Sequence, residues 1–134
     1  MLDFNQFNEL GKDRFPGYLG IVVTAVEENN VFMEMPIRPE IFAPNGYVHG
    51  GSIVALADTA AGYATVLNLP EGARSFTTIE LKTNFVGAAK EGTLECESIL
   101  DHKGRTTQVW RVIVRHKEKQ KNVAIFTCTN LILY

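Results

Sequence analysis

Cysteine is scarce in this sequence, which has only two among its 134 residues. Cys96 and Cys128 lie in separate apolar segments, and neither belongs to a CxxC motif or to a cluster of histidines and cysteines. We therefore expect two buried, reduced thiols, and neither a disulfide nor a metal site.

The sequence also lacks long hydrophobic runs. No apolar stretch reaches the roughly 18 residues that a membrane-spanning helix needs. The first residues, MLDFNQFNELGKDRF, have neither the basic region nor the long apolar region of a signal peptide. We therefore expect a cytoplasmic protein that does not associate with membranes.

An excess of basic residues is absent as well. Thirteen Lys and Arg stand against fifteen Asp and Glu, which gives a formal net charge of -2. Surfaces that bind nucleic acid usually carry a basic excess or a basic stripe, so no nucleic-acid partner is expected. The densest charged run, residues 115–121, lies between two strand-like segments and is predicted to be a solvated hairpin turn.

Hydrophobic residues make up 46% of the chain, which is typical of a folded protein, and residues 1–134 are predicted to form a single domain. A short helix is expected within residues 3–12 and a long one over residues 50–67. Strands are expected over residues 18–27, 31–37, 75–87, 92–101, 105–116 and 122–133. This order predicts an α+β fold in which a curved antiparallel sheet of about six strands wraps around one long central helix.

Two of the predicted strands have informative patterns. In the strand 75–87, simple alternation places five residues on one face: Thr77, Ile79, Leu81, Thr83 and Phe85. The last strand, 122–133, is apolar on both faces, which in so short a chain suggests burial against a second subunit.

The long helix has one charged residue, Asp58, among many small ones. A carboxylate in an otherwise buried helix tends to have a raised pKa, and such groups cluster at functional sites. Gly50 and Gly51 open the helix, so its first N–H groups are accessible and could stabilise an oxyanion. The structural alternatives are that Asp58 has a backbone or arginine partner, and that the glycines only permit close packing.

Geometry restricts how these groups could act together. Gly50 and Asp58 are eight residues apart, or about 12 Å along a helix axis, which is too far for one carbonyl to contact both. Two antiparallel helices from two subunits solve this problem, because a two-fold axis then creates sites that combine Gly50 of one chain with Asp58 of the other.

The block HGGSIVALADTAAGYA resembles the hotdog-fold thioesterases, in particular the branch similar to PaaI and to 4-hydroxybenzoyl-CoA thioesterases. The shared pattern is His-Gly-Gly followed by an acidic residue nine positions after the histidine, and the whole chain fits the family's order of elements. The resemblance implies hydrolysis of an acyl-CoA or aryl-CoA thioester to the free acid and CoA. It also implies a homo-oligomer, expected to be a tetramer, with the active site at a dimer interface, and no cofactor beyond the coenzyme A of the substrate.

The resemblance also implies roles for single residues. The Gly50 N–H would polarise the thioester carbonyl, and Asp58 of the partner chain would act as general base or as nucleophile. His49 would hold the start of the helix, and Thr78 would support the acid or the water. Candidate substrate-binding residues are Gly51, Tyr47 and the phosphate-binding Lys90, Lys103 and Arg105. Further candidates for the pocket lining are Ile53, Leu56, Tyr63 and Phe85.

One position departs from the family pattern. Family members commonly carry Asn or Gln six residues before the histidine, where this chain has Ala43, and Asn45 is the candidate substitute. This departure leaves open a non-catalytic acyl-CoA-binding module. A hotdog-fold hydratase or dehydratase is a further alternative, which the Gly-Gly directly after His49 disfavours. The sequence does not distinguish an acyl chain from an aryl ring as the substrate group.

Overall fold

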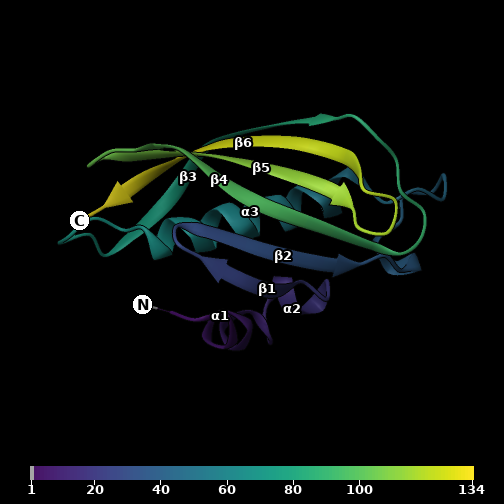
Figure 1. Ribbon diagram of the computed structural model, residues 1–134, viewed down its shortest axis with the longest axis horizontal. Helices are drawn as coiled ribbons and strands as arrows, with labels where there is room; N and C mark the ends of the chain where they lie inside the picture. The colour runs from purple at the N-terminus through teal and green to yellow at the C-terminus, as the bar shows by residue number, and fades with distance from the viewer. Residues whose placement is uncertain (1) are drawn as a thin grey trace.

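A curved antiparallel sheet dominates the structure, a computed structural model that describes residues 2–134 (Figure 1). Its six strands lie in the order β1-β2-β4-β5-β6-β3. The strands are β1 (Val22–Glu27), β2 (Asn30–Pro36), β3 (Ser75–Phe85), β4 (Thr93–Lys103), β5 (Thr107–His116) and β6 (Lys121–Leu133). The helices are α1 (Phe4–Gly11), α2 (Phe15–Tyr18) and α3 (Gly50–Leu67), with a short 3-10 turn, η1, at Pro39–Ile41.

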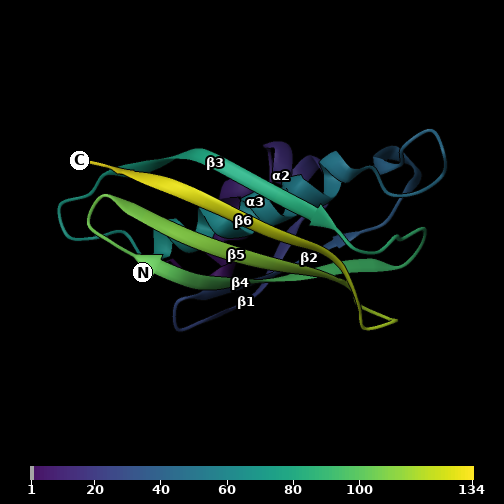
Figure 2. The ribbon, with the colours of Figure 1, turned by 90° about the horizontal axis from the view of Figure 1, so that it is seen from above.

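The long helix α3 crosses one face of the sheet, and the core lies between them (Figures 1 and 2). Leu56 and Ala60 of α3 and Trp110 and Phe126 of the sheet are all fully buried there. The small side chains of α3 let the sheet approach the helix closely. The predicted hotdog fold, with six strands around one central helix, is confirmed.

The N-terminal segment differs in part from expectation. Helix α1 confirms the predicted short helix, and its Phe7 ring stacks on Tyr63 of α3 with the ring centroids 4.8 Å apart. The predicted strand 18–27 is wrong in its first part, because residues up to Tyr18 form the short helix α2, with Pro16 in its first turn, and Gly20 turns the chain at a φ of 74°. Strand β1 begins only at Val22.

The edge strand β1 is covered by a side chain from α1. The Val23 N–H donates to Asn8 Oδ1 at 2.7 Å, and Asn8 Nδ2 donates to the Val23 carbonyl at 3.1 Å. The Asn8 amide thus pairs with both backbone groups of one strand residue.

Strand β3 contains a bulge that corrects the predicted faces. Thr78 is paired with Asn130 and Glu80 with Thr129, so Ile79 is an extra residue without a direct partner on β6. One extra residue exchanges the faces of everything beyond it. The helix-facing residues are therefore Phe76, Thr78, Leu81, Thr83 and Phe85, and the predicted grouping of Thr77 and Ile79 with the last three is wrong.

The outer edge of β3 is open. Leu81 and Phe85 face the helix side of the sheet, where core residues are buried, yet they are 42% and 53% exposed. Ile79 and Val86, also on this segment, are 58% and 54% exposed. An unpaired strand edge with apolar side chains is a surface that another chain can cover.

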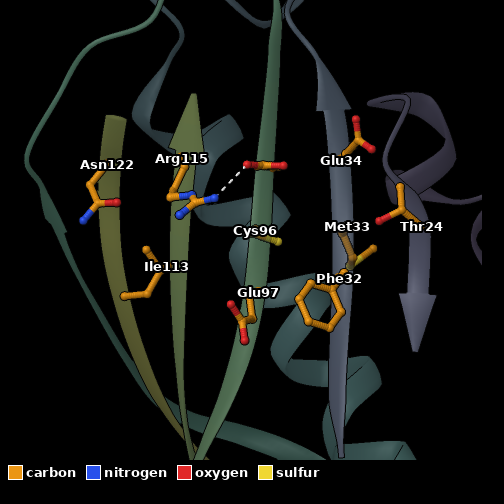
Figure 3. A pocket seen from close by; sticks show the side chains of 10 residues that line it. Thr24, Phe32, Met33, Glu34, Cys96, Glu97, Ile113, Arg115 and Asn122 are labelled. Carbon is orange, nitrogen blue, oxygen red and sulfur yellow. Dashed lines mark hydrogen bonds and ion pairs between the residues drawn. The ribbon is translucent and has the colours of Figure 1, made fainter. Parts of the chain in front are cut away.

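The opposite face of the sheet, which we call the outer face, carries charged and apolar side chains (Figure 3). Phe32, Glu97, Ile113 and Arg115 line a shallow hollow on it, formed mainly by β2, β4 and β5. On β6, Ile125 and Leu131 are partly exposed on this face, while Phe126 points to the core. The expected tetramer therefore remains a prediction.

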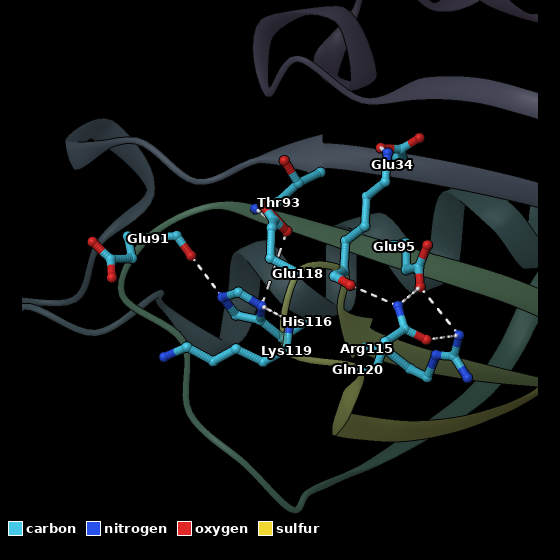
Figure 4. A network of polar contacts seen from close by, with 10 residues as sticks. Glu34, Glu91, Thr93, Glu95, Arg115, His116, Glu118, Lys119 and Gln120 are labelled. Atoms are coloured by element: carbon cyan, nitrogen blue, oxygen red, sulfur yellow. Dashed lines mark hydrogen bonds and ion pairs between the residues drawn. The ribbon is translucent and has the colours of Figure 1, made fainter.

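The charged run 115–121 ends strand β5 and forms the turn to β6, as expected, but His116 within it is buried (Figure 4). The His116 Nε2 lies 2.7 Å from the carbonyl oxygen of Glu91, and the Lys119 N–H donates to its Nδ1 at 3.2 Å. These contacts require the proton on Nε2, with Nδ1 as acceptor. His116 thereby ties the turn to the loop that carries Lys90.

Candidate active site

The start of α3 leaves one N–H group free. His49 is the N-cap, and its Nδ1 accepts a hydrogen bond from the Gly51 N–H at 2.8 Å. The Ser52 N–H donates to the His49 carbonyl at 2.9 Å. The Gly50 N–H has no acceptor among residues 2–134. It is therefore available to a ligand at the positive end of the helix dipole.

This geometry gives His49 a capping role. We expect His49→Ala to lower the free energy of unfolding by about 1 kcal/mol, because the Gly51 N–H loses its acceptor, and His49→Asn to retain most of it. Chemical denaturation measures both values. Turnover of the Asn variant should stay within about tenfold of wild type, because the asparagine side chain also accepts a hydrogen bond at the start of the helix. A loss in the Asn variant as large as that of an Asp58 variant would instead mark His49 as the catalytic base.

The two glycines have different neighbours. A Cβ at Gly50 would lie 3.0 Å from the Phe85 ring, and a Cβ at Gly51 would lie 2.9 Å from His49 Nδ1. The absence of side chains therefore lets Phe85 approach the start of the helix and lets the His49 cap form. Close packing and an accessible Gly50 N–H are both features of the same arrangement.

Asp58 lies two turns further along α3 and is partly buried. Its carboxylate makes no hydrogen bond or ion pair with any other residue from 2 to 134, so this chain supplies neither of the structural partners considered above. Burial raises the pKa of the Asp58 carboxyl above its usual range. Burial also raises the pKa of the Cys128 thiol to about 12, and the Asp58 charge contributes to this rise.

Thr78 is occupied by a buried polar chain. Its hydroxyl donates to Asn130 Oδ1 at 2.9 Å, and Asn130 Nδ2 donates to Thr65 Oγ1 at 2.7 Å. Thr65 lies seven residues beyond Asp58 on α3, or about 10 Å along the axis. Within one chain, Thr78 therefore packs near the C-terminal half of α3 and is not brought together with Asp58.

The loop before α3 and the loop between β3 and β4 bring three of the predicted residues together. Lys90 Nζ lies over the Tyr47 ring, 4.4 Å from its centroid, and both side chains are exposed. The Asn45 side-chain oxygen accepts from the Tyr47 N–H at 3.2 Å, so its amide oxygen is held within the loop. Ala43 is part of the same turn, where its N–H donates to the Tyr47 carbonyl at 2.7 Å.

Lys103 and Arg105 lie elsewhere. They flank the β4–β5 turn, where the Arg105 guanidinium lies 5.9 Å from the Tyr134 ring centroid. The neighbouring Gln108 donates to the Asn68 carbonyl at the C-terminal end of α3. One subunit therefore holds Lys90 at one end of the helix and Lys103 and Arg105 at the other.

Other kinds of site find little support in the described part of the chain. Residues 2–134 contain no group of three or more histidine, cysteine or acidic side chains placed to hold a metal ion. None of their helices is both long and apolar enough to cross a membrane.

Comparison with known proteins gives a consistent result. The family model of the thioesterase superfamily matches residues 45–123. A 1,4-dihydroxy-2-naphthoyl-CoA hydrolase of Listeria monocytogenes is 27% identical over 83% of this chain and 89% of its own. A thioesterase structure from Haemophilus influenzae is 26% identical, with a TM-score of 0.93 over 99% of this chain and 92% of its own. The PaaI structure from Escherichia coli, 24% identical over 89% of this chain and 83% of its own, shares the fold with a TM-score of 0.78.

Proposed function

We propose, because the chain belongs to the thioesterase superfamily, that it hydrolyses acyl-CoA or aryl-CoA thioesters at a site shared between two subunits. The observation that carries this proposal is that one helix holds both a free N–H, at Gly50, and a carboxylate without a partner, at Asp58. These are the two groups that hydrolysis of a thioester needs: an oxyanion donor and a base.

The two groups of one chain are too far apart to act on one carbonyl. They lie eight residues apart on α3, about 12 Å along the axis, so a second antiparallel α3 has to bring in the complementary group. The open edge of β3 and the exposed Leu81 and Phe85 beside α3 support a second copy at this place. A two-fold axis here would cover the apolar surface and create two identical sites.

In the proposed reaction, the thioester carbonyl oxygen accepts a hydrogen bond from the Gly50 N–H. The partner subunit's Asp58 takes a proton from a water molecule, whose oxygen attacks the carbonyl carbon. The oxyanion of the tetrahedral intermediate is stabilised by Gly50 and by the dipole of α3. Collapse of the intermediate breaks the carbon–sulfur bond, and the leaving thiolate of CoA recovers the proton from Asp58. The products are the free acid and CoA.

Asp58 could also attack the carbonyl itself and form a mixed anhydride. Its partly buried carboxylate is suited to either role, since desolvation increases its basicity and removes water that would screen it. Hydrolysis in water labelled with ¹⁸O under single-turnover conditions separates them, because only the anhydride route transfers a label to Asp58.

In such a dimer, basic side chains from both subunits would bind the phosphates of coenzyme A. Lys90 lies near the start of α3. An antiparallel arrangement of the two helices would bring the C-terminal end of the partner's α3, with the β4–β5 turn beside it, towards this end of the helix. Lys103 and Arg105 of the partner subunit would then join Lys90 around the phosphates. Phe85, which lies against Gly50, and Tyr47, in the loop before α3, suit either an acyl chain or an aryl ring. The Listeria relative, a hydrolase of an aryl-CoA, favours testing aryl esters first.

Mixing of defective chains tests the shared site. Chains carrying Asp58→Asn and chains carrying Gly50→Val should each be inactive alone. When they are co-expressed, half of the dimers are mixed and each mixed dimer holds one intact site, so thiol release should return to about a quarter of the wild-type rate.

The matched control places both substitutions in one chain and co-expresses it with wild type, which leaves no intact site in the mixed dimers. Release of CoA thiol from a panel of acyl- and aryl-CoA esters is the assay, with mass spectrometry of the products. No recovery in the first mixture would contradict the shared site. Hydrated product without thiol would point to a hydratase, and binding of the esters without any product would point to a binding module.

A further inference from the structure

Thr83 carries an unusual hydroxyl. Its Oγ1 is inaccessible to solvent and has no hydrogen-bond partner, a condition that only Arg38 Nε shares among the side-chain nitrogen and oxygen atoms of residues 2–134. Hydroxyls buried without a partner are unfavourable in a folded protein. Thr83 lies on the helix-facing side of β3, on the open edge of the sheet, between the exposed Leu81 and Phe85.

The position of Thr83 along the sheet follows from contacts between β3 and α3. Phe85 lies against Gly50, and Phe76 lies against Gly62. A two-fold axis that brings Gly50 beside the partner's Asp58 passes the helix midway between these two residues, at Val54. Val54 lies a third of the way along α3 from Gly50 to Gly62. The corresponding point on β3, a third of the way from Phe85 to Phe76, falls between Thr83 and Leu81.

The buried hydroxyl decides between these two residues. Both lie on the helix-facing side of β3, but only Thr83 has a side-chain polar atom that lacks a partner within residues 2–134. Thr83 is therefore the residue that a second copy can complete.

The backbone of β3 agrees with this position. The Val86 N–H donates to the Val123 carbonyl of β6 at 2.8 Å. Backbone groups of an antiparallel strand point alternately to its two neighbours, so those of Thr83 point away from β6 and towards the open edge. Two copies of Thr83 can therefore form a hydrogen-bonded pair across the axis, with Cα atoms about 5.5 Å apart.

We propose that Thr83 lies on the two-fold axis opposite Thr83 of the partner subunit and sets the register that brings Gly50 to the partner's Asp58. The inference rests on the proposed two-subunit site. A hydroxyl both donates and accepts, so two identical hydroxyls can bond to each other. Thr83 is partly exposed as a residue, and one rotamer step about χ1 moves its Oγ1 to the open side. Thr83 is thus a positioning residue, which contacts no substrate.

Cross-linking through single cysteines tests the register. In Thr83→Cys, the two new thiols face each other within the Cα separation that a disulfide accepts, so mild oxidation should double the 14.9 kDa chain on a non-reducing gel. Leu81→Cys and Phe85→Cys are the matched controls, two residues to either side on the same face. Neither should cross-link alone, but the double variant Leu81→Cys/Phe85→Cys should, because residue 81 faces residue 85 of the partner.

Kinetics supply a second test. Thr83→Val should lower kcat about tenfold, through loss of one buried hydrogen bond, and change KM less, because CoA contacts remain. Thr83→Ser, which keeps the hydroxyl, should restore kcat. A valine variant as fast as wild type, or a serine variant as slow as the valine variant, would overturn the positioning role.

The outcomes separate the two proposals. Cross-linking at position 81 or 85 alone, or none in a protein that sedimentation shows to be a dimer, overturns the axial position of Thr83 and leaves the shared site standing. A protein that is monomeric and active overturns the shared site, and the role of Thr83 with it.

Discussion

Asp58→Asn is expected to lower kcat by about two to four orders of magnitude, the usual contribution of a general base, while KM changes little. The amide has nearly the same shape as the carboxylate, and Asp58 has no hydrogen bond or ion pair within the chain that the substitution would break. Thiol release from the best ester of the panel measures the loss, after sedimentation has confirmed an unchanged assembly.

The same substitution should leave the protein equally stable or more stable at neutral pH. Burial raises the folded-state pKa of Asp58 above its ordinary 3.8, so its ionised form is less favourable in the folded protein than in the unfolded one. This destabilisation is absent below the ordinary pKa and develops as the pH rises through the raised pKa. Wild-type kcat should rise with pH over that raised pKa, because the base must be ionised. A variant that is inactive because it has unfolded would show a lower Tm and would contradict this account.

Leu81→Glu is expected to abolish dimer formation and lower kcat/KM by about a hundredfold or more, because each site then lacks either its base or its oxyanion donor. Leu81 is 42% exposed on the helix side of the open β3 edge, where a partner would bury a charge without a counter-ion. Since the side chain is exposed in the isolated chain, the substituted subunit should still fold. Sedimentation velocity and circular dichroism test assembly and folding separately.

Val22→Glu is the matched control. Val22 is 45% exposed on β1, the edge strand at the opposite side of the sheet, and receives the same new charge. Its dimer and its activity should resemble wild type. If Val22→Glu dissociates the protein and Leu81→Glu does not, the subunits meet at the other edge, and the proposed site loses its structural basis.

The sequence predicted the fold well because its signals were local. The small-residue helix with its opening glycines and the tight turns between β-rich segments fixed the order of the elements. The motif from His49 to Asp58 likewise identified the family. Such features depend on residues close together in the chain, which is why they can be recognised without coordinates.

The errors arose where distant contacts override a local pattern. Ile79 looks like one more alternating residue, and only its lack of a partner on β6 reveals the bulge. His116 looks like part of a solvated charged run, but the Glu91 carbonyl from another loop holds it inside. The open position of Leu81 and the isolated hydroxyl of Thr83 had no signal in the sequence, because both are common residues in a buried strand.

The clasp between Asn8 and Val23 has a consequence for how large an assembly can grow. The Asn8 amide oxygen accepts from the Val23 N–H and the Asn8 amide nitrogen donates to the Val23 carbonyl, so both backbone groups of this edge residue are occupied without a further strand edge being offered. A further strand cannot pair with β1 at Val23, whereas the β3 edge is open, so we expect sheet pairing between copies to occur at β3, where a two-fold contact uses the edge of both chains. Such a contact gives a closed pair, and we expect the Asn8 contact to oppose the continuous ribbons that form when both edges of a sheet can pair.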